Sequence, residues 1–481
     1  MLKSIKANYF YNIANTFLGL IFPLITFPYI SRVLQPEGVG LYNFYSSVIA
    51  YIGLFANLGI SLYATRKIAQ HREDTKLRSK LTVEIFLLNV LTTCIAYFSI
   101  VILDIFVPRI HENSVLFFVM SISVLLGPLS VNWFFQAMED FKYITIRSLL
   151  VKCLSFILLF IFVKDKDDVL IYAIIGLIAV AGNNIFNIIH VRRYIHLKGL
   201  DFKELSIFQH MKPSLHLFVL NIAISIYVNL DSVMLGFIIS DEAVGYYSVA
   251  GRISHIILSL VTSLGVVLLP RFSYLIEAEK IEEFNRLCCK SMNFTIGLSL
   301  PIVVGVIMFA SPLIVFLCGH NYEESVLVLQ LISPIILFAG ITNVLGIQIL
   351  YPKGKEKLVI YSTIGAAVVN FILNLTLIPR YSYNGAAFST CIAELVVLII
   401  QILLGKQYFP KGIFSKSIID YVIGVVLMFV ILFGIVMSEM SIWLELIIGT
   451  VLGALTYFAF LIFRRNDLAQ SVVIIIKNRI K

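Results

Sequence analysis

The stretch from Asn229 to Arg252 places two opposite charges inside apolar sequence. Asp231 and Arg252 each lie about ten residues from a short polar turn at Asp241 and Glu242. At about 1.5 Å of rise per helical residue, both would lie roughly 15 Å from that turn, near the midplane of a hydrocarbon core about 30 Å thick. A charge there costs about 2.5–3.5 kcal/mol, so it must be paired or face water. We predict that Arg252 binds an anionic group and that Asp231 pairs with Arg252 or takes a coupling cation. The alternative is an ion pair that only fixes helix packing.

Four further ionisable residues are candidates for the same site. His255 follows Arg252 by three residues and shares its helix face, which suits either a proton carrier or a packing histidine. Arg32 closes the first apolar run and is predicted either to face a cavity or to lie at the outer interface. Glu394 stands alone in an apolar run and is predicted either to couple a cation or to pair with another helix. Lys152 is predicted either to serve transport or to extend its ammonium group to the membrane interface.

Amide side chains recur at helical spacing in two apolar runs. Asn183 and Asn187 are four residues apart, as are Asn370 and Asn374. Such stripes suit sugar hydroxyl groups, and they equally suit interhelical hydrogen bonds of about 0.6 kcal/mol each. The aromatic segment 133–135 is predicted to form a belt at the membrane interface rather than a platform for sugars.

The composition is that of a polytopic membrane protein. Of 481 residues, 59% are hydrophobic and only 14% are charged, and the mean hydropathy is +0.94. Soluble domains carry about 25% charged residues. The formal charge of +9 reflects basic loops on one side of the membrane, not a nucleic-acid surface. The six cysteines show no Cys-x-x-Cys spacing, so we expect neither a disulfide framework nor a metal site.

Apolar runs and basic loops together predict fourteen transmembrane helices with both termini in the cytoplasm. Most Lys and Arg residues occupy every second loop, and dropping one span would scramble that alternation. The first run has no cleavage site and is predicted to be retained. The predicted spans are 9–31, 38–62, 83–107, 115–138, 146–163, 169–190, 214–239, 244–270, 291–317, 326–350, 358–378, 385–404, 418–436 and 443–463.

These spans divide into two halves of parallel topology and a C-terminal extension. The predicted lobes are 1–200 and 201–405, with six helices each, and 406–481 forms a terminal helical pair and a cytoplasmic tail. A shift of about 205 positions aligns Gly40 with Gly245, together with four other identities. Secondary transporters are often built from such repeats around a polar interface.

No motif for ATP hydrolysis is present, because the chain lacks Gly-x-x-x-x-Gly-Lys-Ser/Thr. We expect no cofactor. If the protein transports a substrate, the driving force is a gradient of H⁺, of Na⁺ or of the substrate itself.

Four segments resemble one family of exporters. They are Arg32-Val-Leu-Gln-Pro-Glu-Gly-Val-Gly, Trp133-Phe-Phe-Gln-Ala-Met-Glu-Asp-Phe-Lys-Tyr, Asn229-Leu-Asp-Ser-Val-Met-Leu-Gly and Gln348-Ile-Leu-Tyr-Pro-Lys-Gly-Lys-Glu-Lys. In this order on a fourteen-span frame, they are similar to the polysaccharide transporter family, the O-antigen and capsule repeat-unit flippases of the multidrug/oligosaccharidyl-lipid/polysaccharide (MOP) exporter superfamily.

The resemblance implies an all-α fold like that of drug exporters and lipid II flippases, with two lobes that rock about a central cationic cavity. It implies a non-enzymatic transporter of the bacterial cytoplasmic membrane that carries a polyprenyl-diphosphate-linked oligosaccharide, with a polymerase or glycosyltransferases as partners. Arg252 resembles the span-eight arginine of lipid II flippases. A complete cation site like that of the drug exporters is not recognisable.

Two other functions stay open at this point. A multidrug or cation antiporter of the same fold would carry mainly acidic groups in its cavity, whereas arginines are at least as prominent here. A membrane polysaccharide polymerase or ligase needs a large outer loop for its acid and base residues, and the predicted outer loops are about ten residues or fewer.

Overall fold

The computed structural model describes residues 5–196, 201–438 and 440–470, and over these residues its regular structure is entirely helical. Contacts within the chain group it into two compact units, Met1–Gly245 and Tyr246–Lys481. Each unit is described by itself. The predicted lobe boundaries at 200 and 405 stay a prediction, and the end of the predicted cytoplasmic tail lies outside the described residues.

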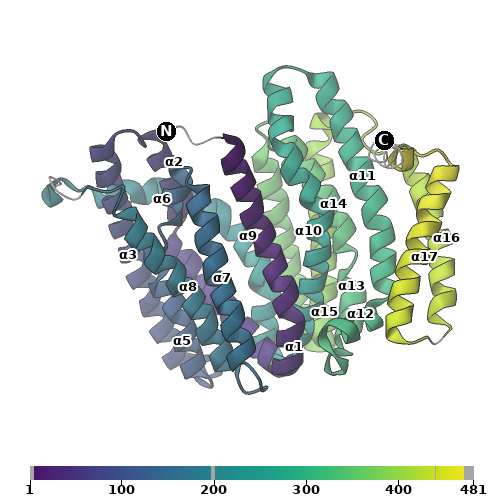
Figure 1. Ribbon diagram of the computed structural model, residues 1–481, viewed down its shortest axis with the longest axis horizontal. Helices are drawn as coiled ribbons and strands as arrows, with labels where there is room; N and C mark the ends of the chain where they lie inside the picture. The colour runs from purple at the N-terminus through teal and green to yellow at the C-terminus, as the bar shows by residue number, and fades with distance from the viewer. Residues whose placement is uncertain (1–4, 197–200, 439, 471–481) are drawn as a thin grey trace. The chain divides into compact units, whose positions relative to one another are not determined.

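The first unit combines long apolar helices with short connecting ones (Figure 1). Helix α3 begins at Asp74, whose carboxylate accepts a hydrogen bond of 2.9 Å from the Leu77 amide, as is typical of a helix N-cap. The elements are α1 (Ile5–Asn57), α2 (Ile60–Gln70), α3 (Thr75–Phe106), α4 (Pro108–His111), α5 (Ser114–Leu125), η1 (Gly127–Ser130), α6 (Asn132–Ala137), α7 (Phe141–Phe162), α8 (Val169–Val191), η2 (Phe202–Glu204), η3 (Ile207–His210) and α9 (Met211–Ile238).

Helix α10 begins in the last residues of the first unit and continues into the second. A single turn of π-helix, η5, follows α14 and brings the chain to a basic turn before α15. The elements are α10 (Asp241–Glu277), α11 (Ile281–Met308), α12 (Ala310–Cys318), η4 (His320–Tyr322), α13 (Ser325–Ile332), α14 (Ile335–Asn343), η5 (Val344–Leu350), α15 (Glu356–Gly405), η6 (Lys406–Tyr408), α16 (Ser417–Val436) and α17 (Ile442–Phe463).

The described residues contain 10 helices that are long and apolar enough to cross a membrane, or up to 11 if one bent pair counts as a single span. The chain is therefore a multi-pass membrane protein. Two of its helices are kinked rods: α1 has a non-helical residue at Gln35 (φ 61°) and α15 has one at Ser382 (φ 50°). Each kink falls where two predicted spans adjoin. The count of fourteen spans and the orientation of the termini stay predictions.

The two copies of the predicted internal repeat meet within the first unit. A Cβ atom added to Gly40 would overlap the carbonyl of Asp241, and one added to Gly245 would overlap the carbonyl of Pro36. Gly245 lies 205 positions after Gly40, and Asp241 lies 205 positions after Pro36, so each copy makes the same contact with the other. Only glycine lets the second half of α1 and the start of α10 approach so closely, as in other tight helix crossings in membranes.

The core of the first unit contains three aromatic residues that the sequence analysis placed elsewhere. Trp133 is 2% exposed and Phe134 and Phe135 are fully buried, packed with Ile60 and Ala64 of α2. The prediction of an interfacial aromatic belt was wrong, because α6 turns these rings inward against α2 and α3. Apolar rings bury large areas, so α6 is firmly attached to its unit.

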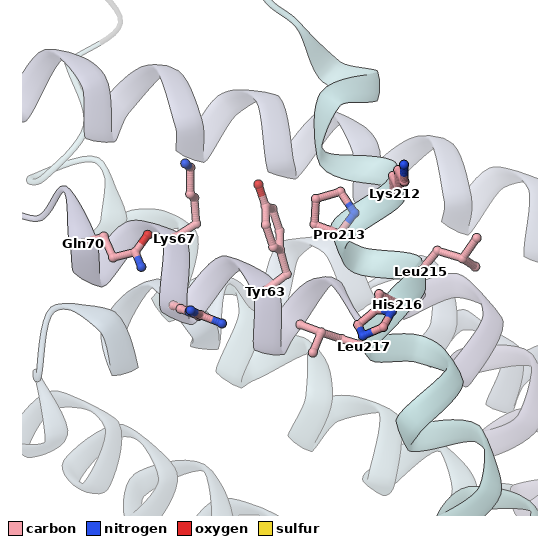
Figure 2. A pocket seen from close by; sticks show the side chains of 9 residues that line it. Tyr63, Lys67, Gln70, Lys212, Pro213, Leu215, His216 and Leu217 are labelled. Atoms are coloured by element: carbon pink, nitrogen blue, oxygen red, sulfur yellow. The ribbon is translucent and has the colours of Figure 1, made fainter. Parts of the chain in front are cut away.

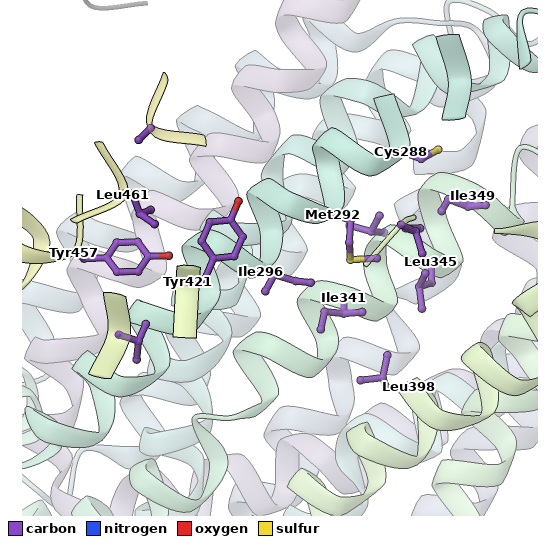
Figure 3. Close-up of a cluster of buried hydrophobic side chains, with 14 of the residues drawn as sticks. Cys288, Met292, Ile296, Ile341, Leu345, Ile349, Leu398, Tyr421, Tyr457 and Leu461 are labelled. Atoms are coloured by element: carbon purple, nitrogen blue, oxygen red, sulfur yellow. The ribbon is translucent and has the colours of Figure 1, made fainter. Parts of the chain in front are cut away.

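The terminal pair α16 and α17 packs on α11 within the second unit (Figures 1 and 3). Tyr457 donates a hydrogen bond of 2.6 Å to the carbonyl of Gly297, and Tyr421 lies beside it in the same buried cluster. A Cβ atom on Gly449 would overlap the ring of Phe309. Small residues thus bring the last two helices close to the rest of the second unit.

Candidate functional site

The turn between α9 and α10 is fixed by an arginine of α4. Arg109 donates hydrogen bonds to the carboxylates of Asp241 and Glu112 and, at 3.1 Å, to the carbonyl of Gly236. Burial lowers the pKa of Arg109, but these hydrogen bonds outweigh it and raise the pKa above its ordinary value, so the side chain stays charged. The end of α9 and the start of α10 therefore hold a set position in the first unit.

Arg252 and His255 share an exposed face of α10. Both side chains are exposed, whereas Ile253 and Ser254 between them are buried. The two residues lie in a candidate membrane span, Asp241–Ser263. A cation exposed to lipid at that depth is costly, so a water-filled space is the favoured surrounding for this face.

Asp231, the predicted partner of Arg252, lies on α9 in the first unit and is only 3% exposed. Its carboxylate is close enough to the Tyr51 hydroxyl of α1 to interact electrostatically with it. Helix α9 packs on α1 and α2. Asp231 and Arg252 belong to different units, so the predicted ion pair stays a prediction.

Arg32 and Lys152 take different positions in the first unit. Arg32 is exposed on α1, and its carbonyl accepts a hydrogen bond of 2.7 Å from Gln35 at the kink. Lys152 is half-buried on α7, with its ammonium 6.0 Å from the centre of the Phe22 ring. That is the outer limit of a cation–π interaction and turns Lys152 toward α1.

Asn187 belongs to a buried polar network between α7, α8 and the segment before α6. Its side-chain oxygen accepts hydrogen bonds from Arg147 and, at 3.3 Å, from Tyr143, and its amide donates to the Ser130 carbonyl. Arg147 is 5% exposed and also donates to the Asn132 side chain at 3.0 Å. Asn187 is therefore engaged in helix packing, and binding a sugar would require these bonds to open.

Asn183 lies one turn earlier on α8 and is half-buried. Its amide donates a hydrogen bond of 2.8 Å to the Ala179 carbonyl of its own helix. Its side-chain oxygen is buried and accepts no hydrogen bond among the described residues. The two predicted asparagines thus differ, since only Asn183 keeps a vacant acceptor.

Glu394 of the second unit is half-buried on α15, close to Cys391. One turn before it, Thr390 joins a polar network, in which its hydroxyl lies 3.2 Å from that of Tyr247 on α10. Asn370 donates to Thr390 at 3.5 Å and accepts a hydrogen bond of 3.2 Å from Asn374. The second amide stripe therefore bonds across the kink of its own helix α15 and is linked to α10 through Thr390.

A neutral polar cavity of about 320 Å³ lies within the first unit, between α1, α3 and α5. Ser46 and Asn57 of α1, Asn89 and Thr93 of α3 and Ser123 of α5 contribute to its lining. The Thr93 hydroxyl is buried and has no hydrogen-bond partner among the described residues. An uncharged cavity with hydroxyl and amide groups is suited to bind sugar hydroxyls.

Sequence reasoning missed this cavity and two buried polar groups. Asn89 and Thr93, four residues apart in an apolar run, were the available signal. Glu84 is fully buried and pairs at 2.9 Å with His210, and Arg147 is buried although it lies close in sequence to the basic residue Lys142. An isolated acid within an apolar run, as at Glu84, was a sign of a buried partner.

The fold is shared with a solved flippase structure. The solved structure of the lipid II flippase MurJ in an inward closed conformation superposes with a TM-score of 0.71 at 16% sequence identity, covering 95% of this chain and 99% of that one. At this identity the likeness shows the fold, and it agrees with the class expected from the sequence.

The chain belongs to the polysaccharide biosynthesis protein family, whose model matches residues 5–276. Curated relatives include the "Putative O-antigen transporter" of Escherichia coli (strain K12), 26% identical over 84% of this chain and 97% of that protein. The capsular polysaccharide biosynthesis protein CapF of Staphylococcus aureus is 25% identical over 86% of this chain and 100% of its own length. The family assignment made from the four sequence segments is confirmed.

Proposed function

We propose that this protein is a flippase for a polyprenyl-diphosphate-linked oligosaccharide repeat unit, acting in the bacterial cytoplasmic membrane during synthesis of a surface polysaccharide. The observation that carries the proposal is the exposed pair Arg252 and His255 within an apolar span. The names of the O-antigen and capsule relatives support a saccharide as the cargo.

The physical task explains why such residues are useful. A diphosphate–sugar headgroup cannot cross hydrocarbon unaided, because each unpaired polar group costs several kcal/mol there. Arg252 would offset the phosphate charge, and the neutral cavity with Asn89 and Thr93 would offer hydrogen bonds to sugar hydroxyls. The lipid tail would remain in the bilayer.

The proposed transport cycle is alternating access through a cationic cavity. It is driven by an H⁺ or Na⁺ gradient or by the gradient of the cargo. Asp231 and Glu394 are the proposed coupling acids, and Arg32, Lys152, Asn183 and Asn187 complete the proposed site. A polymerase or glycosyltransferase of the same pathway would be the functional partner.

Purified protein in liposomes provides the direct test. A fluorescent polyprenyl-diphosphate-linked oligosaccharide is placed in both leaflets, and a membrane-impermeant quencher reports how fast labelled headgroups change sides. We expect rapid exchange with this protein and slow exchange in empty liposomes. Equal rates in the two preparations would contradict the proposal.

A second candidate function is export of cationic drugs in exchange for a cation. It is favoured by the match of the MatE family model to residues 217–376. The same liposomes loaded with a cationic dye discriminate the two functions. Gradient-driven dye efflux without movement of the lipid-linked oligosaccharide would establish the antiporter instead.

A further inference from the structure

A second cavity in the first unit has a strongly basic lining. It has a volume of about 800 Å³ and lies between α2 and the first turns of α9 (Figure 2). Tyr63, Arg66, Lys67 and Gln70 fall at positions i, i+3, i+4 and i+7 of α2, so that they form one face of that helix. Lys212 and His216, four residues apart, line it from α9.

The described residues that line the cavity include no carboxylate. Among the described residues, Arg66, Lys67 and Lys212 make no ion pair with an acidic side chain. The first turn of α9 adds the partial positive charge of a helix N-terminus. Three cations that are not neutralised within the protein leave this cavity ready to bind a multiply charged anion.

Glu84, an acid that acts electrostatically on the lining residue Tyr63, is engaged elsewhere. Glu84 accepts hydrogen bonds from His210 at 2.9 Å, from the Ser206 amide at 2.8 Å and from Gln209 at 3.1 Å. His210 in turn lies 2.7 Å from the Tyr63 hydroxyl. This buried chain of contacts holds α2 and the start of α9 together, so the basic groups are positioned before any ligand binds.

A hollow at the α10–α11 turn provides a contrast. It is lined by the cations Lys280 and Arg286 and by three glutamates, and Arg271 pairs with one of these, Glu283. Its acids outnumber its cations, so a basic cavity is not a general property of the loops of this chain.

We propose that the cavity between α2 and α9 is an entry site that binds the diphosphate of the lipid-linked oligosaccharide before it reaches Arg252. This inference rests on the proposed function. The volume is within the range of about 300–1,000 Å³ for small-ligand sites and exceeds what a diphosphate alone needs. The basic segments that form the cavity are predicted to face the cytoplasm, where the lipid-linked unit is made. The group recognised at this site is a phosphate anion, and the headgroups of anionic phospholipids carry the same group.

Binding is measured on the full-length protein in nanodiscs, with inorganic pyrophosphate and with a polyprenyl-diphosphate-linked oligosaccharide as probes. We expect the R66Q/K67Q/K212Q variant to bind both probes at least tenfold more weakly, and the charge-retaining R66K/K67R/K212R variant to bind them nearly as well as the wild type. R286Q is the matched control, because it removes a cation from the acidic hollow instead. Thermal unfolding of each variant establishes that it is folded.

Two results would overturn the inference. One is unchanged probe binding by folded R66Q/K67Q/K212Q protein. The other is displacement of the oligosaccharide probe by phosphatidylglycerol at equal concentration, which would make the cavity a phospholipid headgroup site. Failure of the entry site is distinguishable from failure of the proposed function, since wild-type exchange in liposomes tests the latter alone.

Discussion

Two arginines in apolar spans of this protein should respond in opposite ways to replacement by alanine. Arg252 is exposed on α10, so R252A leaves no cavity in the core and should cost less stability than removal of a buried arginine. If Arg252 offsets a phosphate charge at the membrane midplane, its loss should raise the barrier by about 2.5–3.5 kcal/mol. That is a slowing of the exchange rate by about 100-fold.

Arg147 provides the comparison, because it is an arginine in an apolar helix whose side chain is buried rather than exposed. R147A would remove two hydrogen bonds from a charged donor, to Asn187 and Asn132, each contributing about 1.5–3 kcal/mol. It would also remove a cation–π contact with Tyr143, 5.5 Å from the guanidinium carbon to the ring centre. Relief of the desolvation of Arg147 opposes these losses, so we expect a net destabilisation of about 2–4 kcal/mol.

Both quantities are measurable on the same preparations. Thermal unfolding in detergent reports stability, and headgroup exchange in liposomes, normalised to inserted protein, reports transport. R252A should lose less stability than R147A and exchange slowly, whereas R147A should unfold several degrees below the wild type. If R252A exchanges at the wild-type rate, or loses as much stability as R147A, the assignment of Arg252 to the transport path is refuted.

Three further substitutions test other parts of the structure. E84Q removes the charge that holds His210 and should lower the free energy of unfolding by about 2–3 kcal/mol, as measured by thermal unfolding; an unchanged midpoint would contradict the role given to this pair. T93V deletes a buried hydroxyl that has no hydrogen-bond partner among the described residues. It should leave stability equal or up to about 1 kcal/mol higher while slowing oligosaccharide exchange severalfold. Unaltered exchange would place the neutral cavity off the transport path. The added methyl group of G449A should overlap the Phe309 ring, destabilise the packing of α17 by about 1–3 kcal/mol and expose that helix to proteolysis. Resistance to proteolysis equal to that of the wild type would show that the structure accommodates the methyl group without loss of stability.

The sequence was sufficient for features that depend on one helix at a time. Hydropathy identified a multi-pass, all-helical membrane protein, and the spacing of Arg252 and His255 predicted the shared face that the structure shows. The repeat register also anticipated that Gly40 and Gly245 are equivalent. These features follow from local periodicity, which a single chain displays directly.

Features that depend on a partner helix could not be predicted. Trp133 at a span end looks the same whether α6 faces the interface or packs against α2, and only the packing decides. Arg147 resembles a loop residue until Asn187 and Asn132 are known to surround it. Kinks at Gln35 and Ser382 stand where loops between spans were expected. They could not be predicted, because neither residue type signals a positive φ.

The crossing at Gly40 and Gly245 also bears on ancestry. A contact in which each copy presents the same surface to the other is the isologous contact of a two-fold symmetric homodimer. A gene for half of this chain could have encoded a self-associating subunit before fusion joined two copies. After fusion each copy could change alone, and only one now carries Asp231 and Arg252, where the other has Thr26 and Ser47.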